Sequence, residues 1–145
     1  MGEKFIREPS YTVSFLFRRI LVPIDGSSHS LRAASVAIDF AQRYGSRLTF
    51  LHVVPSEKDR TEAEKVFEKV KKMVEDAGVV ANYKIKHADI PNSSITAEIL
   101  KEAKDGLYSA IIMGSRGLTE SEELTIGDTA MSVSLFAPCS VLIIR

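Results

Sequence analysis

Five short apolar runs, rich in residues that favour β-strands, alternate along this 145-residue chain with segments of helical periodicity. The apolar runs cover residues 18–24, 47–54, 79–87, 108–113 and 140–145, and the helical segments cover 31–44, 61–77, 95–105 and 127–137. This alternation is typical of right-handed crossovers and of a parallel sheet with helices on both faces. The sequence therefore predicts one α/β domain. The run 79–87 alternates apolar and polar residues, so we expect it near a sheet edge.

The composition restricts the class of protein. Nineteen basic residues balance nineteen acidic ones, so no global field attracts nucleic acid or an anionic membrane. No apolar run approaches the roughly 20 residues of a membrane span. The single cysteine, Cys139, cannot form an internal disulfide, which favours a reducing compartment, and the three histidines lack zinc-site spacing. We expect a cytoplasmic protein with no metal site and no nucleic-acid or membrane partner.

Residues 1–17 precede the first apolar run and lack the basic start, long apolar stretch and small-residue cleavage site of a signal peptide. Residues 1–10 are polar and irregular, whereas residues 11–17 are rich in strand formers. Two alternatives stay open for this extension, a disordered arm and an extra edge strand. The domain itself is expected over residues 18–145.

The stretch that follows the fourth run carries three glycines before a helical segment, Gly114, Gly117 and Gly127. Glycines between a strand and a helix let backbone N–H groups turn toward an anion, which predicts a phosphate site. Arg116 is the one cation of this stretch. Its acidic residues, which a phosphate disfavours, are Glu120, Glu122, Glu123 and Asp128.

Ligands of open parallel sheets bind beyond the carboxyl ends of the strands, where the strand order reverses. Two loops compete for that position, residues 25–28 after the first run and residues 114–126 after the fourth. If the first and fourth strands are neighbours, both loops face one crevice. The sequence has no Gly-x4-Gly-Lys-Ser/Thr loop, no Gly-x-Gly-x-x-Gly fingerprint and no nucleophile placed beside a base, so we expect no enzymatic activity.

Three stretches together resemble the universal stress protein family. They are Ile-Leu-Val-Pro-Ile-Asp-Gly-Ser at 20–27, Leu-His-Val-Val at 51–54, and Gly114-x2-Gly117-x9-Gly127 followed by Ala-Pro-Cys-Ser-Val-Leu-Ile-Ile at 137–144. The resemblance covers residues 18–145. It implies a five-stranded parallel sheet in the order 3-2-1-4-5 with helices on both faces, a Rossmann-like fold. It also implies a homodimer, often joined through the last strands, and an apolar edge at 141–144 agrees with that.

Some members of this family bind ATP and others do not. Carried over from the binders, the ribose and adenine would lie by Asp25 and by Val53 or Val54, and the phosphates by Gly114, Gly117 and Gly127. The departure is Asp128, which stands where the ATP-binding pattern has serine or threonine. Mg²⁺ would be expected only together with bound ATP.

A magnitude helps to judge Asp128. Two unit charges about 4 Å apart interact by roughly 1 kcal/mol in water and about 4 kcal/mol at an effective dielectric constant of 20. Repulsion between Asp128 and a phosphate would therefore weaken binding by a factor of about ten to nearly a thousand. An aspartate in the first turn of a helix also stabilises that helix without any ligand.

Three functions remain open from the sequence. The first is a regulatory stress-response module that binds an adenine nucleotide, and the second is a dimeric interaction module of the same fold that binds none. The third is a phosphoacceptor receiver domain, because Asp25 and Asp89 each follow a predicted strand.

Overall fold

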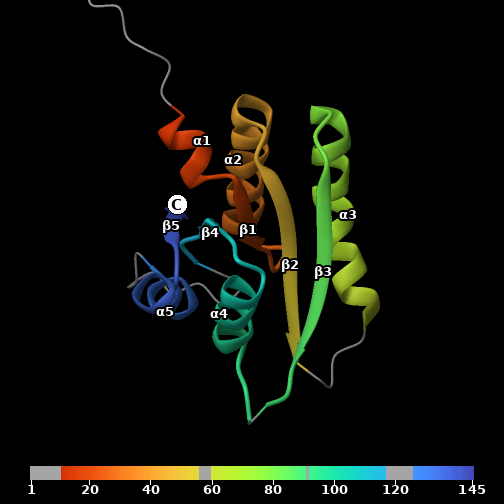
Figure 1. Cartoon of the computed structure of the whole chain (residues 1–145). Coiled ribbons are helices and arrows are strands. Elements are labelled where there is room, and N and C mark those ends of the chain that lie inside the picture. Colours follow the sequence, from red (N-terminus) through yellow and green to blue (C-terminus); the bar gives the residue numbers. More distant parts are fainter. Residues whose placement is uncertain (1–10, 56–59, 91, 117–125) are drawn as a thin grey trace, which may run out of the picture.

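In a computed structural model, which describes residues 11–55, 60–90, 92–116 and 126–145, five strands form one parallel sheet in the order β3-β2-β1-β4-β5 (Figure 1). The strands are β1 (Arg19–Pro23), β2 (Arg47–Pro55), β3 (Ala81–Ala88), β4 (Ala110–Gly114) and β5 (Ser140–Ile144). The helices are α1 (Thr12–Leu16), α2 (Ser28–Tyr44), α3 (Arg60–Ala77), α4 (Ile95–Asp105) and α5 (Asp128–Phe136). The predicted α/β architecture and strand order are confirmed.

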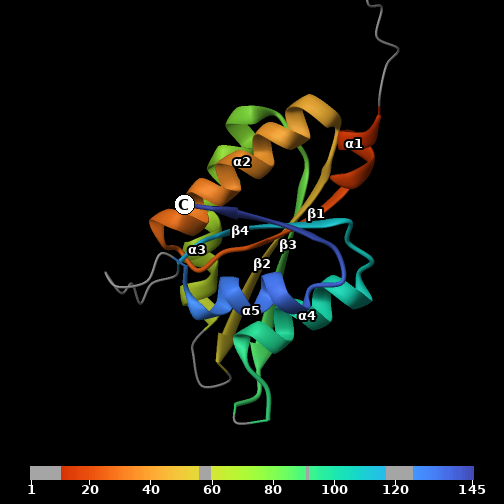
Figure 2. The same cartoon turned by 90° about the vertical axis from the view of Figure 1, so that its left-hand side faces the viewer.

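The sheet lies between two helical layers, with α2 and α3 on one face and α4 and α5 on the other (Figure 2). Successive side chains of a strand enter opposite faces, so the sheet supports two cores. Ile20, Val22 and Phe50 belong to the core under α2 and α3, whereas Leu21 and Leu51 belong to the core under α4 and α5. Because β1 is covered on both faces, its sequence is continuously apolar rather than alternating.

Caps set the helix starts. The Ser27 side chain accepts a hydrogen bond from the Ser30 amide, so α2 begins at Ser28, three residues before the predicted start. Ser94 caps α4 in the same way through the Ala97 amide. The predicted edge position of the third strand is confirmed, since β3 forms one edge of the sheet.

The segment 11–17 is neither of the two alternatives that the sequence offered. Residues 12–16 form the short helix α1, and the following Phe17 ring packs against Phe40 of α2 with 4.6 Å between ring centroids. This aromatic contact, together with local bonds such as Phe15 N–H to the Tyr11 carbonyl, outweighs the strand preference of the segment. Residues 1–10 lie outside the described residues.

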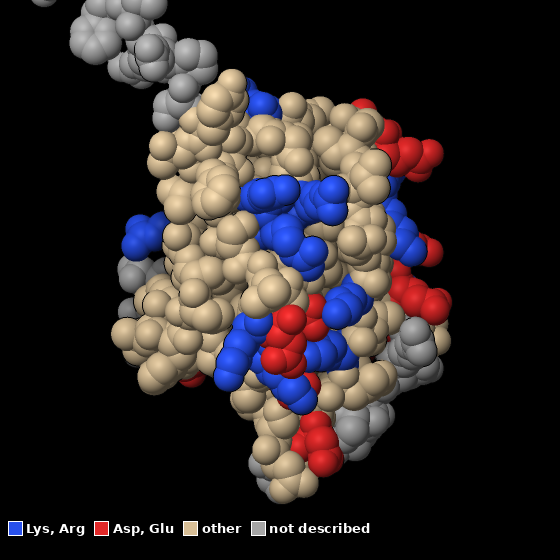
Figure 3. Space-filling model, viewed as in Figure 1, with Lys and Arg blue, Asp and Glu red and all other residues tan. Residues whose placement is uncertain are grey.

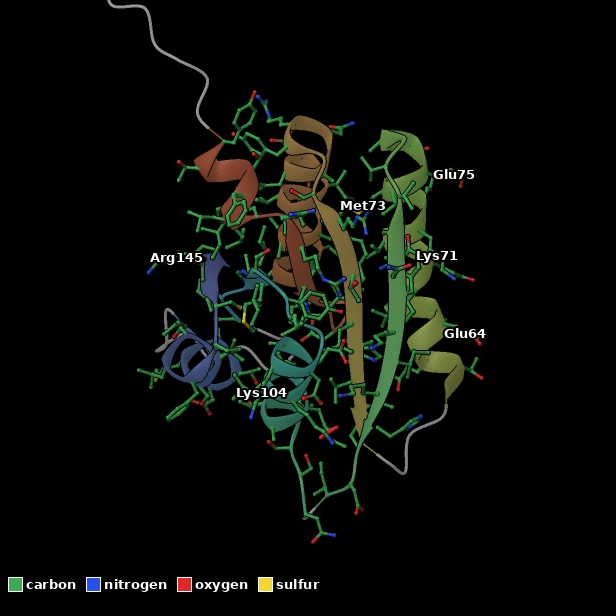
Figure 4. All side chains as sticks on the ribbon, in the orientation of Figure 1. Glu64, Lys71, Met73, Glu75, Lys104 and Arg145 are labelled. Atoms are coloured by element: carbon green, nitrogen blue, oxygen red, sulfur yellow. The ribbon has the colours of Figure 1, made fainter. Side chains whose placement is uncertain are left out.

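Helix α3 has one polar side and one apolar side. Glu64 and Glu75 lie on the side that is turned away from the sheet, and Met73 lies between α2 and α3 (Figure 4). Among the described residues, no helix is long and apolar enough to cross a membrane.

A buried carboxylate joins the edge strand β3 to α4. Glu102 is 3% exposed and accepts hydrogen bonds from Lys84 Nζ at 2.9 and 3.1 Å and from the Tyr108 hydroxyl at 2.9 Å. Lys86 Nζ lies 3.6 Å from the same carboxylate. Burial alone would raise the pKa of Glu102, but the bonds from Lys84 and Tyr108 outweigh it and lower the pKa below 4.5.

We expect Glu102→Gln to lower the free energy of unfolding by about 1–3 kcal/mol at neutral pH, because buried charge-assisted hydrogen bonds are lost. A depressed folded-state pKa means that the contribution of Glu102 is complete above the unfolded pKa and is lost as pH falls through the folded pKa. Urea unfolding near pH 7 and near pH 3 should show a large difference from the unsubstituted protein at the first pH and a small one at the second.

Glu98→Gln is the matched control for this prediction. Its side chain is 17% exposed and lies 3.9 Å from Lys86, so its effect should be smaller at both pH values. Equal losses for Glu102→Gln at both pH values would show that packing, not charge, carries the effect.

Candidate functional site

A cleft of about 490 Å³ opens at the carboxyl ends of β1, β2 and β4, between the starts of α2 and α5. Because β1 and β4 are neighbours, the loops that follow them face the same space, as the strand order predicts. Most of the predicted site residues line this cleft, namely Asp25, Val53, Val54, Gly114, Arg116, Gly127 and Asp128. A volume of this size falls within the range of small-molecule sites.

A larger concavity of about 640 Å³ lies at the other end of the molecule, between the last turns of α2 and α3. Of the described residues in its lining, none is a predicted site residue, and only Arg47 is charged. The cleft is therefore the better candidate, because apolar walls and convergent polar groups occur together there.

Asp25 orders the turn that follows β1. Its Oδ1 accepts a hydrogen bond from the Ser27 amide at 2.9 Å, and Gly26 adopts the left-handed conformation with φ of 88°. The Ser30 hydroxyl donates to the Ser27 carbonyl at 3.0 Å and accepts from the Asp25 amide at 3.3 Å. Asp25 thus has a structural role in addition to its place in the cleft wall.

His52 is a site residue that the sequence did not indicate as one. It is 9% exposed, lines the cleft, and its Nδ1 lies 2.7 Å from the Ile24 carbonyl oxygen. A carbonyl oxygen only accepts, so Nδ1 is the donor of this hydrogen bond. His52 therefore fixes the position of the turn that carries Asp25. A histidine inside a mostly apolar buried strand was the available signal.

Gly114 is required by packing. A Cβ at this position would lie 2.7 Å from the carbonyl carbon and 2.9 Å from the Cβ of His29, in the first turn of α2. The end of β4 can approach the start of α2 this closely only without a side chain. This contact brings the loop after β4 next to the loop after β1.

Ser115 and Gly127 fix the start of α5. The Ser115 amide donates to the Ile144 carbonyl at 2.7 Å, and the Ser115 carbonyl accepts from the Gly127 amide at 2.6 Å. The Gly127 amide is therefore already engaged. Ser115 is 2% exposed, and its Oγ has no hydrogen-bond partner among the described residues. A buried hydroxyl without a partner is costly, so Ser115 is a second site residue that the sequence did not single out.

Helix α5 begins at the cleft with Gly127 as its N-cap, which supplies no capping side chain. Asp128 occupies the first helical position and is exposed. It therefore acts on the helix through its charge, which the positive end of the helix dipole favours, and not through a capping bond. The amides of the first helical turn, which have no intrahelical acceptor, belong to residues 128–130 in the cleft wall.

The structure describes the glycine-rich stretch only up to residue 116 and from residue 126 onward. Arg116 is half-buried at the cleft, whereas Gly117, Glu120, Glu122 and Glu123 lie outside the described residues. Within the described ranges, no group of three His, Cys, Asp or Glu side chains could hold a metal ion. Cys139 is half-buried beside α5, and burial raises the pKa of its thiol.

Asp89 lies apart from this cleft. It follows the edge strand β3, where its carboxylate accepts from Asn92 Nδ2 at 3.1 Å, and β2 separates β3 from β1. Asp25 and Asp89 therefore do not form the acidic pair of a receiver domain, and that alternative is wrong.

The packing role of Gly114 is testable. We expect Gly114→Ala to lower the free energy of unfolding by about 1–3 kcal/mol, because overpacking forces the β4 loop and α2 apart. Urea denaturation without any ligand measures this change. Gly127→Ala is the milder comparison, since its Cβ would lie 3.3 Å from the Ser115 carbonyl oxygen and its φ of −79° suits alanine, so it should cost less than Gly114→Ala. Equal stability of Gly114→Ala and the unsubstituted protein would contradict the packing role.

Comparison with known proteins agrees with this geometry. The model of the universal stress protein family matches residues 16–145. Universal stress protein MJ0531 of Methanocaldococcus jannaschii is 31% identical over 146 residues, which cover 90% of this chain and 83% of that relative. The structure of the universal stress protein UspA from Lactobacillus plantarum aligns with a TM-score of 0.76 at 23% identity, covering 89% of this chain and 98% of that one.

Two further solved structures of this fold hold adenine nucleotides. A universal stress protein from Archaeoglobus fulgidus in complex with dAMP aligns with a TM-score of 0.71 at 19% identity, covering 90% of this chain and 99% of that chain. Another universal stress protein, in complex with cAMP, aligns with a TM-score of 0.68 at 18% identity, covering 88% and 96%. At these identities the likeness concerns the fold. From the family match and the relative at 31% identity, the chain belongs to the universal stress protein family.

Proposed function

We propose that this protein is a regulatory stress-response module of the cytoplasm that binds an adenine nucleotide in the cleft without turning it over. The observation that carries the proposal is the convergence of three features on one cleft. They are the first turn of α5, the Asp25 turn, and the Ser115 hydroxyl, which has no partner among the described residues. The dAMP and cAMP complexes of two proteins with the same fold support an adenine nucleotide as the ligand.

The base and the ribose would occupy the apolar part of the cleft. Val53 is 7% exposed and Val54 is 1% exposed, at the end of β2, and Ile95 and Ile99 of α4 belong to the same lining. An adenine ring buries well against such residues, and strand-end carbonyls can accept from its amino group. The ribose hydroxyls would then lie toward Asp25, as in the ATP-binding members that the sequence resembles.

The phosphate end has mixed chemistry. Arg116, the Ser115 hydroxyl and the amides at the start of α5 favour an anion, and Asp128 disfavours it. Since Asp128 is exposed, water screens its charge, and the penalty falls near the lower end of the electrostatic range, about tenfold for one close phosphate charge. A triphosphate brings more charge toward Asp128 than a monophosphate does. We therefore propose that AMP binds more tightly than ATP, and that Mg²⁺ is present only where ATP is bound.

Calorimetry with AMP and with ATP plus Mg²⁺ tests this proposal. We expect micromolar binding of AMP, weaker binding of ATP, and a gain of about tenfold or more in ATP affinity for Asp128→Ser. Asp76→Ser, which removes the same charge from the exposed surface of α3, should leave both affinities unchanged. Chromatography of the recovered nucleotide should show no hydrolysis.

No binding of either nucleotide by the unsubstituted protein and by Asp128→Ser would refute nucleotide binding. The second function, an interaction module that binds no nucleotide, would then be the better one. Binding of ATP that is as tight as that of AMP would remove the proposed role of Asp128.

We also propose that the protein forms a homodimer through β5. This strand is the second edge of the sheet, its residues 141–144 are only half-buried, and soluble proteins cover such apolar edges. The adjacent helix α5 exposes Leu135 and Phe136, each at 71%. A second copy of the same surface would cover both features.

Light scattering should give twice the 16.0 kDa chain mass for the unsubstituted protein. A charged group at the open edge opposes strand pairing, so Leu142→Lys should shift the protein to a monomer. Asn82→Lys, at the opposite edge strand β3, is the control that should stay dimeric. A monomeric unsubstituted protein at concentrations of tens of micromolar would contradict this proposal.

A further inference from the structure

A basic concavity lies at the amino ends of β1 and β2, at the end of the sheet opposite the cleft. It has a volume of about 330 Å³, and we call it the arginine pocket, defined by Phe15, Arg18, Arg19, Arg47, Leu107 and Ser109. Figure 3 shows a group of Lys and Arg side chains near the middle of one face of the molecule, with Asp and Glu side chains next to the lower members of that group. Among the described residues, none that lines the pocket is acidic.

Two of these arginines are register partners. Arg19 of β1 pairs with Arg47 of β2, and both side chains leave the same face of the sheet because Ile20 and Leu48 enter the opposite core. Both arginines are exposed. Like charges that lie directly opposite each other in a sheet repel, so this pairing does not serve the stability of the sheet.

The three arginines of the pocket have no acidic partner among the described residues. In the described part of the chain, no carboxylate lies within 4.0 Å of a guanidinium nitrogen of Arg18, Arg19 or Arg47. The nearby Glu102 is already held by two lysines.

Arg19 is also held in position. Its guanidinium carbon lies 5.0 Å from the centroid of the Tyr108 ring, whose hydroxyl is fixed by Glu102. The Ser109 hydroxyl accepts from the Arg19 amide at 2.8 Å and donates to the Arg19 carbonyl at 3.1 Å. A side chain that is ordered before binding loses less entropy when it binds a ligand.

The walls of the arginine pocket are apolar and exposed. Phe15 is 71% exposed and Leu107 is 82% exposed. Leu107 adopts the left-handed conformation, with φ of 53°, at the position after the end of α4 where glycine is common. The left-handed conformation strains the backbone of a leucine, and the exposed side chain adds nothing to the core. The stability of the fold therefore does not explain why a leucine occupies this position.

We propose that the arginine pocket binds a small phosphate monoester that carries a flat apolar group, at a site separate from the nucleotide cleft. Guanidinium groups pair with phosphate oxygens through two parallel hydrogen bonds, and three of them more than offset the two negative charges of a phosphate dianion. Phe15 and Leu107 would contact the apolar group. Phenyl phosphate represents this chemistry, and inorganic phosphate represents its anionic part alone.

The test is a titration of the full chain, followed through its amide resonances, with phenyl phosphate and with inorganic phosphate. We expect shifts at Arg19, Arg47 and Ser109, and binding of phenyl phosphate about fivefold tighter than that of inorganic phosphate. Arg47→Gln and Arg18→Gln should each lower the affinity for phenyl phosphate by about fivefold or more. The dispersion of the same spectra shows that each variant is folded.

Arg43→Gln is the matched control, because it removes the same charge from an exposed arginine of α2 that already pairs with Asp39 at 3.0 Å. Its affinity should equal that of the unsubstituted protein. Absence of shifts at the arginine pocket with about 10 mM phenyl phosphate, or equal effects of Arg47→Gln and Arg43→Gln, would overturn the proposal. The nucleotide proposal is read from other amides, those of residues 114–116 and 127–130, so either proposal can fail alone.

Discussion

The pairing of β1 with β4 is the constraint on which the rest of this molecule depends. It places the reversal of strand order at the centre of the sheet, so that the chain leaves β1 toward α2 and leaves β4 toward α5, on opposite faces. The space between these exits is the cleft. Ile20, Leu21 and Val22 of β1 are fully buried, which fixes the central strand rigidly. The approach of Gly114 to His29 then fixes how closely the two exits lie together.

The glycine-rich stretch is accordingly explained in part without a ligand. Gly114 gives room to α2, and the Gly127 amide is bonded to the Ser115 carbonyl. What the fold leaves unexplained is the buried Ser115 hydroxyl, which has no partner among the described residues, whereas the helix dipole accounts for Asp128. In the proposed function, the Ser115 hydroxyl favours a bound phosphate and the Asp128 carboxylate opposes it.

The two ends of the sheet differ in charge although the chain as a whole is neutral. Strand carboxyl ends and helix starts gather at the cleft, where two aspartates lie among backbone amides. Arginines gather at the amino ends, where the buried Glu102 is already paired with lysines and cannot offset them. A net charge of zero therefore excludes a uniform field but not a local anion site.

The sequence by itself determined the parallel sheet, because buried strands and the helices between them leave a periodic pattern. The strand order and most of the cleft residues came from the resemblance of three stretches to a known family. The sequence did not determine α1, since the Phe17–Phe40 contact that holds this helix joins segments far apart in the chain. His52, Ser115 and the arginine pocket were also missed. Each depends on neighbours that are distant in the sequence. His52 lies beside the Ile24 carbonyl, and the Ser115 hydroxyl has no partner among the described residues. The strand register sets Arg19 opposite Arg47. Spacing along a chain predicts which face a side chain takes, but only the folded packing decides its neighbours across that face.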